Sequence, residues 1–214
     1  METIFTILLI IHIIAGSIGL LTGTINIIKK KGDKAHKNVG KFFFYSMLIN
    51  GFAGFIMSLI HRNDFLLIVA VFSIYMVATG QRFLSLKQLN KEQKPKAIDW
   101  ILTYTMLVFA FLFIIYGSYL LINKVNFGIV LLVFGVVSCL MAIKDIKVYK
   151  GNIKEKNYWL LLHIQRMVGS YIAALTAFIV VNNHFLPGIV GWLLPTVIFT
   201  PLIVKWTKQY RVQI

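Results

Sequence analysis

The chain has 214 residues, of which 58% are hydrophobic and 14% charged, and its mean hydropathy is +0.80. Soluble domains contain roughly 45–50% apolar residues, so this composition excludes an ordinary water-soluble domain and predicts a protein whose solvent is lipid. The formal net charge is +15. The basic residues lie in short segments between apolar runs, which is typical of membrane topology and argues against nucleic acid as a partner.

The first apolar run begins directly after Met1 and Glu2 and continues to about Ile28. It lacks a basic segment at its start and is longer than the roughly 7–15 apolar residues of a signal peptide. We therefore predict a retained membrane helix rather than a cleaved leader.

A helix needs about 20 mainly apolar residues to cross the hydrocarbon core of a bilayer. Seven stretches meet this requirement and leave no room for a soluble domain, so residues 1–214 are predicted to form a single all-α transmembrane domain, a bundle of seven helices. The predicted helices are residues 4–28, 38–60, 65–86, 98–122, 127–147, 158–182 and 188–206.

The connectors between these stretches alternate in charge. The connectors after the second, fourth and sixth predicted helices are poor in basic residues. The first of these contains only Arg62, the second only Lys124, and the third neither Lys nor Arg. By the positive-inside rule the basic segments are cytoplasmic, which predicts an external N-terminus and a cytoplasmic C-terminus in a bacterial inner membrane. The basic segments are residues 29–41, 82–96, 144–156 and 205–211.

Small and polar residues form a stripe along the first predicted helix. The stripe contains His12, Gly16, Gly19, Gly23 and Asn26, at steps of three and four residues. Small residues allow a second helix to approach closely, so this stripe is predicted to be a packing face. His12 would lie in the outer half, either as part of a site or as a core histidine that ties two helices together.

Two further histidines are predicted near the cytoplasmic ends of helices. His36 lies one turn before Gly40, close to Asp33, which can cap the second helix. It is either an inward-facing residue or a solvated one. His163 shares a helix face with Arg166, three residues later, and a charge within an apolar helix requires a partner.

Charged residues from several helices are predicted at the same cytoplasmic level. Asp99 and Asp145 would neutralise Arg82 and Arg166 in a structural layer of ion pairs. The alternative is that these groups and the two histidines surround a cofactor or substrate.

The leading specific hypothesis is a b-type haem at the cytoplasmic side. Such a haem takes two histidines from different helices at similar depth, which His36 and His163 satisfy, with Arg82, Arg166 and nearby lysines available for the propionates. Its redox partner would be a quinone or another small molecule. His12 lies too far outward to join this pair, and no second pair of histidines supports an electron path across the whole bilayer.

The same residues also fit other classes of function. A transporter for small anions or organic acids would use Arg82 and Arg166 as its anion site, and a structural or assembly protein would need no ligand. A metal site at His36, His163, Asp99 and Asp145 lacks the compact histidine spacing of a zinc hydrolase. No motif predicts an enzyme, and the oligomeric state is not indicated.

The sequence contains three short motifs: His12 with Ala15-Gly16 and Gly23, Lys31-Gly32 with His36 and Gly40, and His163 with Arg166-Met167. They resemble the bacterial predicted membrane proteins of domain of unknown function 2306. Here His36 is followed by Lys37 rather than by arginine, and Gln165 stands between His163 and Arg166. The resemblance implies that His12, His36 and His163 are positions of interest, without implying a reaction.

Overall fold

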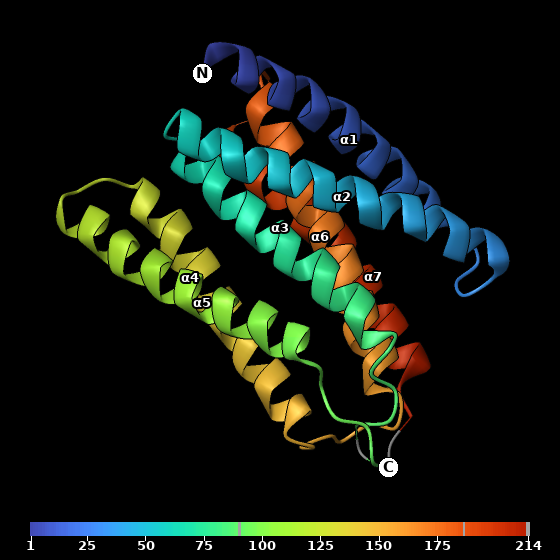
Figure 1. Ribbon diagram of the computed structural model, residues 1–214. Coiled ribbons are helices and arrows are strands. Elements are labelled where there is room, and N and C mark those ends of the chain that lie inside the picture. The colour runs from blue at the N-terminus through green and yellow to red at the C-terminus, as the bar shows by residue number, and fades with distance from the viewer. Residues whose placement is uncertain (90, 186, 213–214) are drawn as a thin grey trace.

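The computed structural model describes residues 1–89, 91–185 and 187–212, and the regular elements of this part of the chain are seven long helices (Figure 1). Each is long and apolar enough to cross a membrane. The protein is therefore a multi-pass membrane protein by the length and composition of its helices. The helices are α1 (Glu2–Ile28), α2 (Lys34–Ile60), α3 (Asp64–Phe83), α4 (Ala97–Ile122), α5 (Phe127–Tyr149), α6 (Tyr158–Asn182) and α7 (Gly188–Tyr210).

Short polar caps and glycine turns separate consecutive helices. Asp33 Oδ1 accepts a hydrogen bond from the backbone N–H of His36 at 2.6 Å, which confirms Asp33 as the N-cap of α2. Because of this cap, α2 starts one turn earlier than the apolar run alone indicates. Asn63 caps α3 in the same way through the N–H of Leu66 at 2.9 Å.

Helices α3 and α6 pack against each other at the centre of the bundle (Figure 1). The α1–α2 pair lies on one side of them and the α4–α5 pair on the other, while α7 packs on α6. This arrangement brings residues that are distant in sequence, on α2, α3 and α6, to one place.

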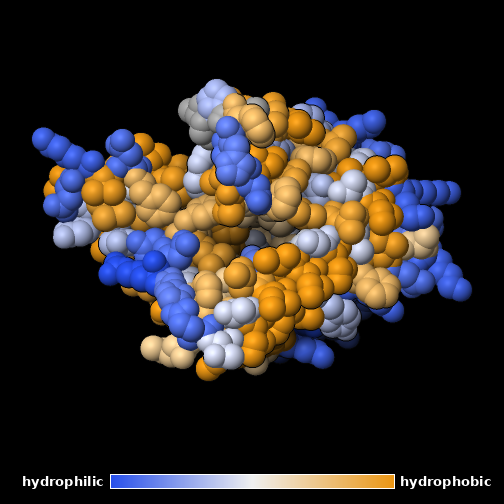
Figure 2. All heavy atoms as spheres, turned by 90° about the horizontal axis from the view of Figure 1, so that it is seen from above, coloured by the Kyte–Doolittle hydropathy of each residue, from blue (hydrophilic) through white to orange (hydrophobic). Residues whose placement is uncertain are grey.

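The outward faces of the helices carry large apolar side chains. Ile14 and Leu21 on α1 are 56% and 65% exposed, and Phe111 on α4 is 55% exposed. Figure 2 shows broad hydrophobic areas on one face of the molecule, with hydrophilic groups mostly toward its margins. In water such a surface would be an aggregation hazard, whereas in a bilayer it is the lipid-facing surface.

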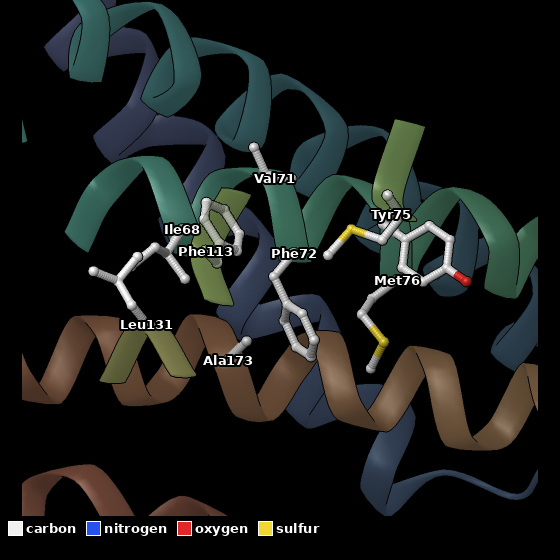
Figure 3. Packing of buried hydrophobic residues seen from close by; sticks show 9 residues of the cluster. Ile68, Val71, Phe72, Tyr75, Met76, Phe113, Leu131 and Ala173 are labelled. Atoms are coloured by element: carbon white, nitrogen blue, oxygen red, sulfur yellow. The ribbon is translucent and has the colours of Figure 1, made fainter. Parts of the chain in front are cut away.

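The main apolar core lies where α3 meets α4, α5 and α6. Phe72 of α3 packs edge to face on Phe134 of α5, with ring centroids 5.1 Å apart. Phe113, Leu131 and Ala173 extend the cluster (Figure 3). The Tyr75 ring lies at one end of it with its hydroxyl pointing away (Figure 3).

The stripe on α1 packs against α2 as predicted. A Cβ on Gly16 would lie 2.7 Å from Asn50 Nδ2, and one on Gly19 would lie 3.0 Å from Met47 Sδ. The small residues of α1 let these side chains of α2 lie directly against its backbone.

Nearly all basic residues gather at the end of the bundle where α1, α3, α5 and α7 finish and α2, α4 and α6 begin, which we call the lysine-rich end. The exceptions are Arg62, Lys124 and Arg166. The backbone N–H of Lys156 donates to the carbonyl of Val212 at 2.9 Å, so the α5–α6 connector is tied to the C-terminal segment.

Candidate functional site

A cavity of about 620 Å³ opens at the lysine-rich end between α1, α2, α3, α6 and α7. This volume lies within the roughly 300–1,000 Å³ of small-molecule and cofactor sites. Both His36 and His163 line it. The two histidines paired by depth in the sequence therefore line one cavity.

His163 is held in a defined orientation by α3. Its Nδ1 lies 2.9 Å from the carbonyl oxygen of Gly80, which has no proton to give, so Nδ1 carries the proton and donates. The lone pair of Nε2 is then available to a ligand. This is the arrangement that orients metal-bound histidines in proteins, where the second ring nitrogen donates to a carbonyl or carboxylate.

Gly80 can make this contact because it has no side chain. A Cβ at this position would lie 2.8 Å from Cβ of Arg166 and 3.4 Å from Cε of Met167. The close approach of α3 and α6 at Gly80 thus positions the His163 ring.

His36 lies in the first turn of α2, where Asp33 fixes the backbone. Its ring Nδ1 is buried and has no hydrogen-bond partner. With its amide oriented to satisfy both ends, Asn26 donates to the carbonyl of His36 at 3.3 Å and accepts from the N–H of Gly40 at 2.9 Å. The helix start is therefore fixed from α1, while the imidazole keeps an unused polar atom.

The described residues that line the cavity include four lysines, at positions 31, 37, 41 and 87, and no Asp or Glu. Lys31 Nζ donates to the carbonyls of Asn26, Ile27 and Lys29 at 2.7–2.9 Å and lies 4.3 Å from the centroid of the Trp206 ring. Partial burial lowers the pKa of Lys31. An anion in the cavity would reverse that shift, because it favours the charged ammonium.

The walls and the deep end of the cavity are largely apolar. Phe43 of α2 and Tyr171 of α6 close the deep end against Gly23 of α1, where an added Cβ would collide with the Tyr171 ring. The Tyr171 hydroxyl is satisfied by Thr24 at 2.7 Å. The cavity therefore combines a cationic mouth with an apolar, aromatic interior.

Arg82 and Arg166 are both in ion pairs and do not line this cavity. Arg82 binds Asp99 through two hydrogen bonds, from Nε to Oδ1 at 2.7 Å and from Nη2 to Oδ2 at 2.9 Å. Arg166 Nη2 donates to Asp145 Oδ1 at 2.6 Å. The structure thus contains the ion pairs that were predicted as the alternative to a site.

His12 lies in the other half of the bundle and binds α2. Its Nδ1 is 3.0 Å from the carbonyl oxygen of Asn50, and the Asn50 amide donates to the carbonyl of His12 at 2.8 Å. This is the contact of a histidine that ties two helices together. His12 is not among the residues that line the cavity with His36 and His163.

Sequence reasoning missed three features of the site. These are the Gly80 carbonyl that accepts from His163, the place of Gly23 at the deep end of the cavity, and the lining that α7 contributes through Trp206 and Tyr210. No local motif marks them, because each depends on which helices pack together. The only sequence signal for any of them was the stripe of small residues on α1, which includes Gly23.

Comparison of the chain with protein-family models, curated proteins and solved structures finds no match. Among the described residues, no group of three or more His, Cys, Asp or Glu side chains is placed to hold a metal ion. The cavity itself is therefore the main evidence for function.

Proposed function

We propose that this membrane protein binds an amphipathic anion in the cavity at the lysine-rich end, and that this ligand is a b-type haem held by His36 and His163. The observation that carries the proposal is the presence of two histidines from different helices in one cavity with a cationic mouth. The lysine-rich end would face the cytoplasm of a bacterial inner membrane, as the positive-inside rule predicts.

The charge of the cavity supports an anionic ligand. Four lysines line it and no described acidic side chain does, so an anionic group at the mouth would meet favourable charge from several directions. The apolar interior around Phe43 and Tyr171 suits a large apolar body. Haem has both parts, since its two propionates project from one edge of an apolar ring.

The histidines support haem over other amphipathic anions. A bis-histidine haem needs two neutral imidazoles, each with a free ring nitrogen. The hydrogen bond from His163 to Gly80 leaves Nε2 free. The His36 ring has no hydrogen bond to another described residue, and because its Nδ1 is buried, Nε2 would be its iron ligand. A ligand held only by charge and apolar contacts would use neither ring.

In this proposal the side chains have separate tasks. His36 and His163 would hold the iron, Lys37 and Lys41 would bind the propionates, and the apolar walls would exclude water. When bound, haem supplies reversible one-electron transfer, and the exchange partner would be a quinone or a small soluble donor. Membership of domain of unknown function 2306 is a further proposal, which rests on the short motifs alone.

Haem binding is tested by titrating the purified protein with haemin and recording spectra before and after reduction with dithionite. We expect one haem per chain and a sharp alpha band on reduction. His163→Ala should abolish that band, and His184→Ala, an exposed histidine outside the cavity, should leave it unchanged. A wild-type protein that takes up no haem would refute the proposal.

A titration without haem uptake would leave the anion-binding cavity to be explained by transport. Flux of small organic anions into proteoliposomes that falls on substitution of Lys37 and Lys41 by Gln would then support a transporter. Arg82 and Arg166 are less suited to that role than the lysines, because each already binds a carboxylate.

A further inference from the structure

A second polar region lies away from the cavity, between α3, α4, α5 and α6. It contains two ion pairs on different helix pairs. Arg82 of α3 binds Asp99 of α4, and Arg166 of α6 binds Asp145 of α5. The Tyr75 hydroxyl donates to the second oxygen of Asp145 at 2.5 Å, so Asp145 is bonded on both oxygens.

Two hydroxyl groups lie near the carboxylates of these ion pairs. Thr103 follows Asp99 by four residues on α4, and Tyr149 follows Asp145 by four residues on α5, so each lies one helical turn from a carboxylate and on the same face. The Tyr149 ring lies 5.2 Å from that of Trp100, about one turn before Thr103 on α4. The hydroxyls of Tyr149 and Thr103 lie near each other without the geometry of a direct hydrogen bond.

Both hydroxyls are buried and have no hydrogen-bond partner among the described residues. Thr103 is 0% exposed and Tyr149 is 6% exposed, and the oxygen of each is without a donor or acceptor. Ser138, two turns before Asp145 on α5, is in the same condition. Buried hydroxyls without a partner cost stability, and in native proteins an internal water usually satisfies them.

The surroundings meet the requirements of such a water. An internal water needs two to four polar partners, and here the two hydroxyls and the carboxylates of Asp99 and Asp145 are available. A carboxylate accepts about four hydrogen bonds. The oxygens of Asp99 bind Arg82 and the backbone N–H of Lys96, which leaves acceptor capacity on this group.

We propose that the interface between α4 and α5 binds internal water at Thr103 and Tyr149, and that this water joins the two ion pairs into one hydrogen-bonded network. The network begins at Arg82, whose side chain is 25% exposed at the lysine-rich end. It ends at Arg166, which is 2% exposed. The network would give water from that end a polar route toward Asp145 inside the bundle, whether or not haem is bound.

The proposal is tested by a double-mutant cycle on thermal unfolding in detergent, with Tyr149→Phe, Thr103→Val and the two combined. If a shared water bridges the hydroxyls, each single change lowers Tm by several degrees, because it leaves the water and its other partner unsatisfied. The double variant then loses less than the sum. As a control, Tyr149→Phe combined with Thr176→Val on a distant part of α6 should be additive.

Single variants with an unchanged or raised Tm would overturn the proposal, because removing a hydroxyl that truly lacks a partner relieves a cost. Additive losses in the Tyr149 and Thr103 cycle would overturn the shared water.

If a variant fails to fold, the solvent accessibility of introduced cysteines tests the network instead. The cysteines are introduced in a Cys139→Ser background. Silver ion should reach the thiol of Thr103→Cys and protect it from later alkylation. It should not protect the thiol of the control Ala110→Cys, at a 0% exposed position in the apolar part of α4. Equal protection of both thiols would contradict the network.

Discussion

Arg166 carries a full positive charge inside the bundle, and Asp145 is the residue that makes this tolerable. The pair is fully buried, with side-chain exposures of 2% and 0%. The Arg166 guanidinium also lies 4.9 Å from the centroid of the Tyr75 ring. A buried charge whose partner is removed has nowhere to find replacement solvation.

Asp145→Ala should therefore be severely destabilising. We expect a loss of about 3–5 kcal/mol, the usual cost of breaking a buried ion pair, measured as a fall in Tm of the detergent-solubilised protein. Asp99→Ala should cost less, because Arg82 is partly exposed and water can solvate it. Equal losses for the two variants would show that Arg166 is better solvated than the structure indicates.

The Gly80 position links α3 to the His163 ring. An added Cβ would lie 2.8 Å from Cβ of Arg166, so Gly80→Ala should push α3 and α6 apart and lengthen the bond between His163 and the Gly80 carbonyl. We expect a loss of about 1–3 kcal/mol from overpacking and weaker ligand binding.

The matched control for Gly80 is Gly191→Ala in α7. The nearest atom to its added Cβ is Cγ2 of Ile179 at 3.5 Å, an ordinary contact. This variant should keep both Tm and ligand affinity. If Gly80→Ala behaves like it, the close approach of α3 and α6 does not position His163.

Among the elements, the α4–α5 pair depends on direct backbone contact. A Cβ on Gly128 would lie 2.5 Å from the carbonyl oxygen of Gly117, and one on Gly135 would lie 3.0 Å from the carbonyl oxygen of Ala110. In lipid, where apolar side chains gain little by leaving the solvent, such close packing is a main source of helix association.

Gly128→Val should separate the start of α5 from the end of α4. Because the obstructing atom belongs to the backbone, the helices must move, at a cost of about 1–3 kcal/mol or more. Thermal unfolding should reveal this loss, whereas Val133→Ala, at a 55% exposed lipid-facing position of the same helix, should have little effect. A Gly128→Val protein as stable as wild type would mean that the pair tolerates a wider separation.

The helices themselves could be predicted from the sequence because the bilayer demands long apolar runs, and such runs are visible without any knowledge of packing. The presence of Asp99 and Asp145 as partners for Arg82 and Arg166 was predictable for a similar reason, since membrane-embedded charges need partners. Helix starts were less predictable where a polar cap such as Asp33 extends a helix beyond its apolar run.

The cavity was not predictable from the sequence. The shared depth of His36 and His163 was visible, but their common cavity depends on α2, α3 and α6 lying together, and on Gly80 and Gly23 leaving space. These are contacts between residues far apart in the chain, and no local pattern specifies them. The unpartnered hydroxyls of Thr103 and Tyr149 became apparent only from the packed structure.

For the whole molecule, the distribution of lysine and arginine is the strongest asymmetry. We expect the lysine-rich end to face the cytoplasm, so cysteines introduced at opposite ends of the bundle should react from opposite sides. In a Cys139→Ser background, an impermeant maleimide should label Lys124→Cys in right-side-out vesicles and Lys94→Cys only in inverted ones. Labelling of both positions from the same side would contradict the topology.

The central claim, that His36 and His163 hold one iron between them, is tested most directly by electron paramagnetic resonance of the ferric protein loaded with haem. Two imidazole ligands give a low-spin ferric signal. We expect that signal in wild type and its conversion to high spin in both His36→Ala and His163→Ala. A high-spin wild type, or a low-spin signal that survives either substitution, would contradict the account.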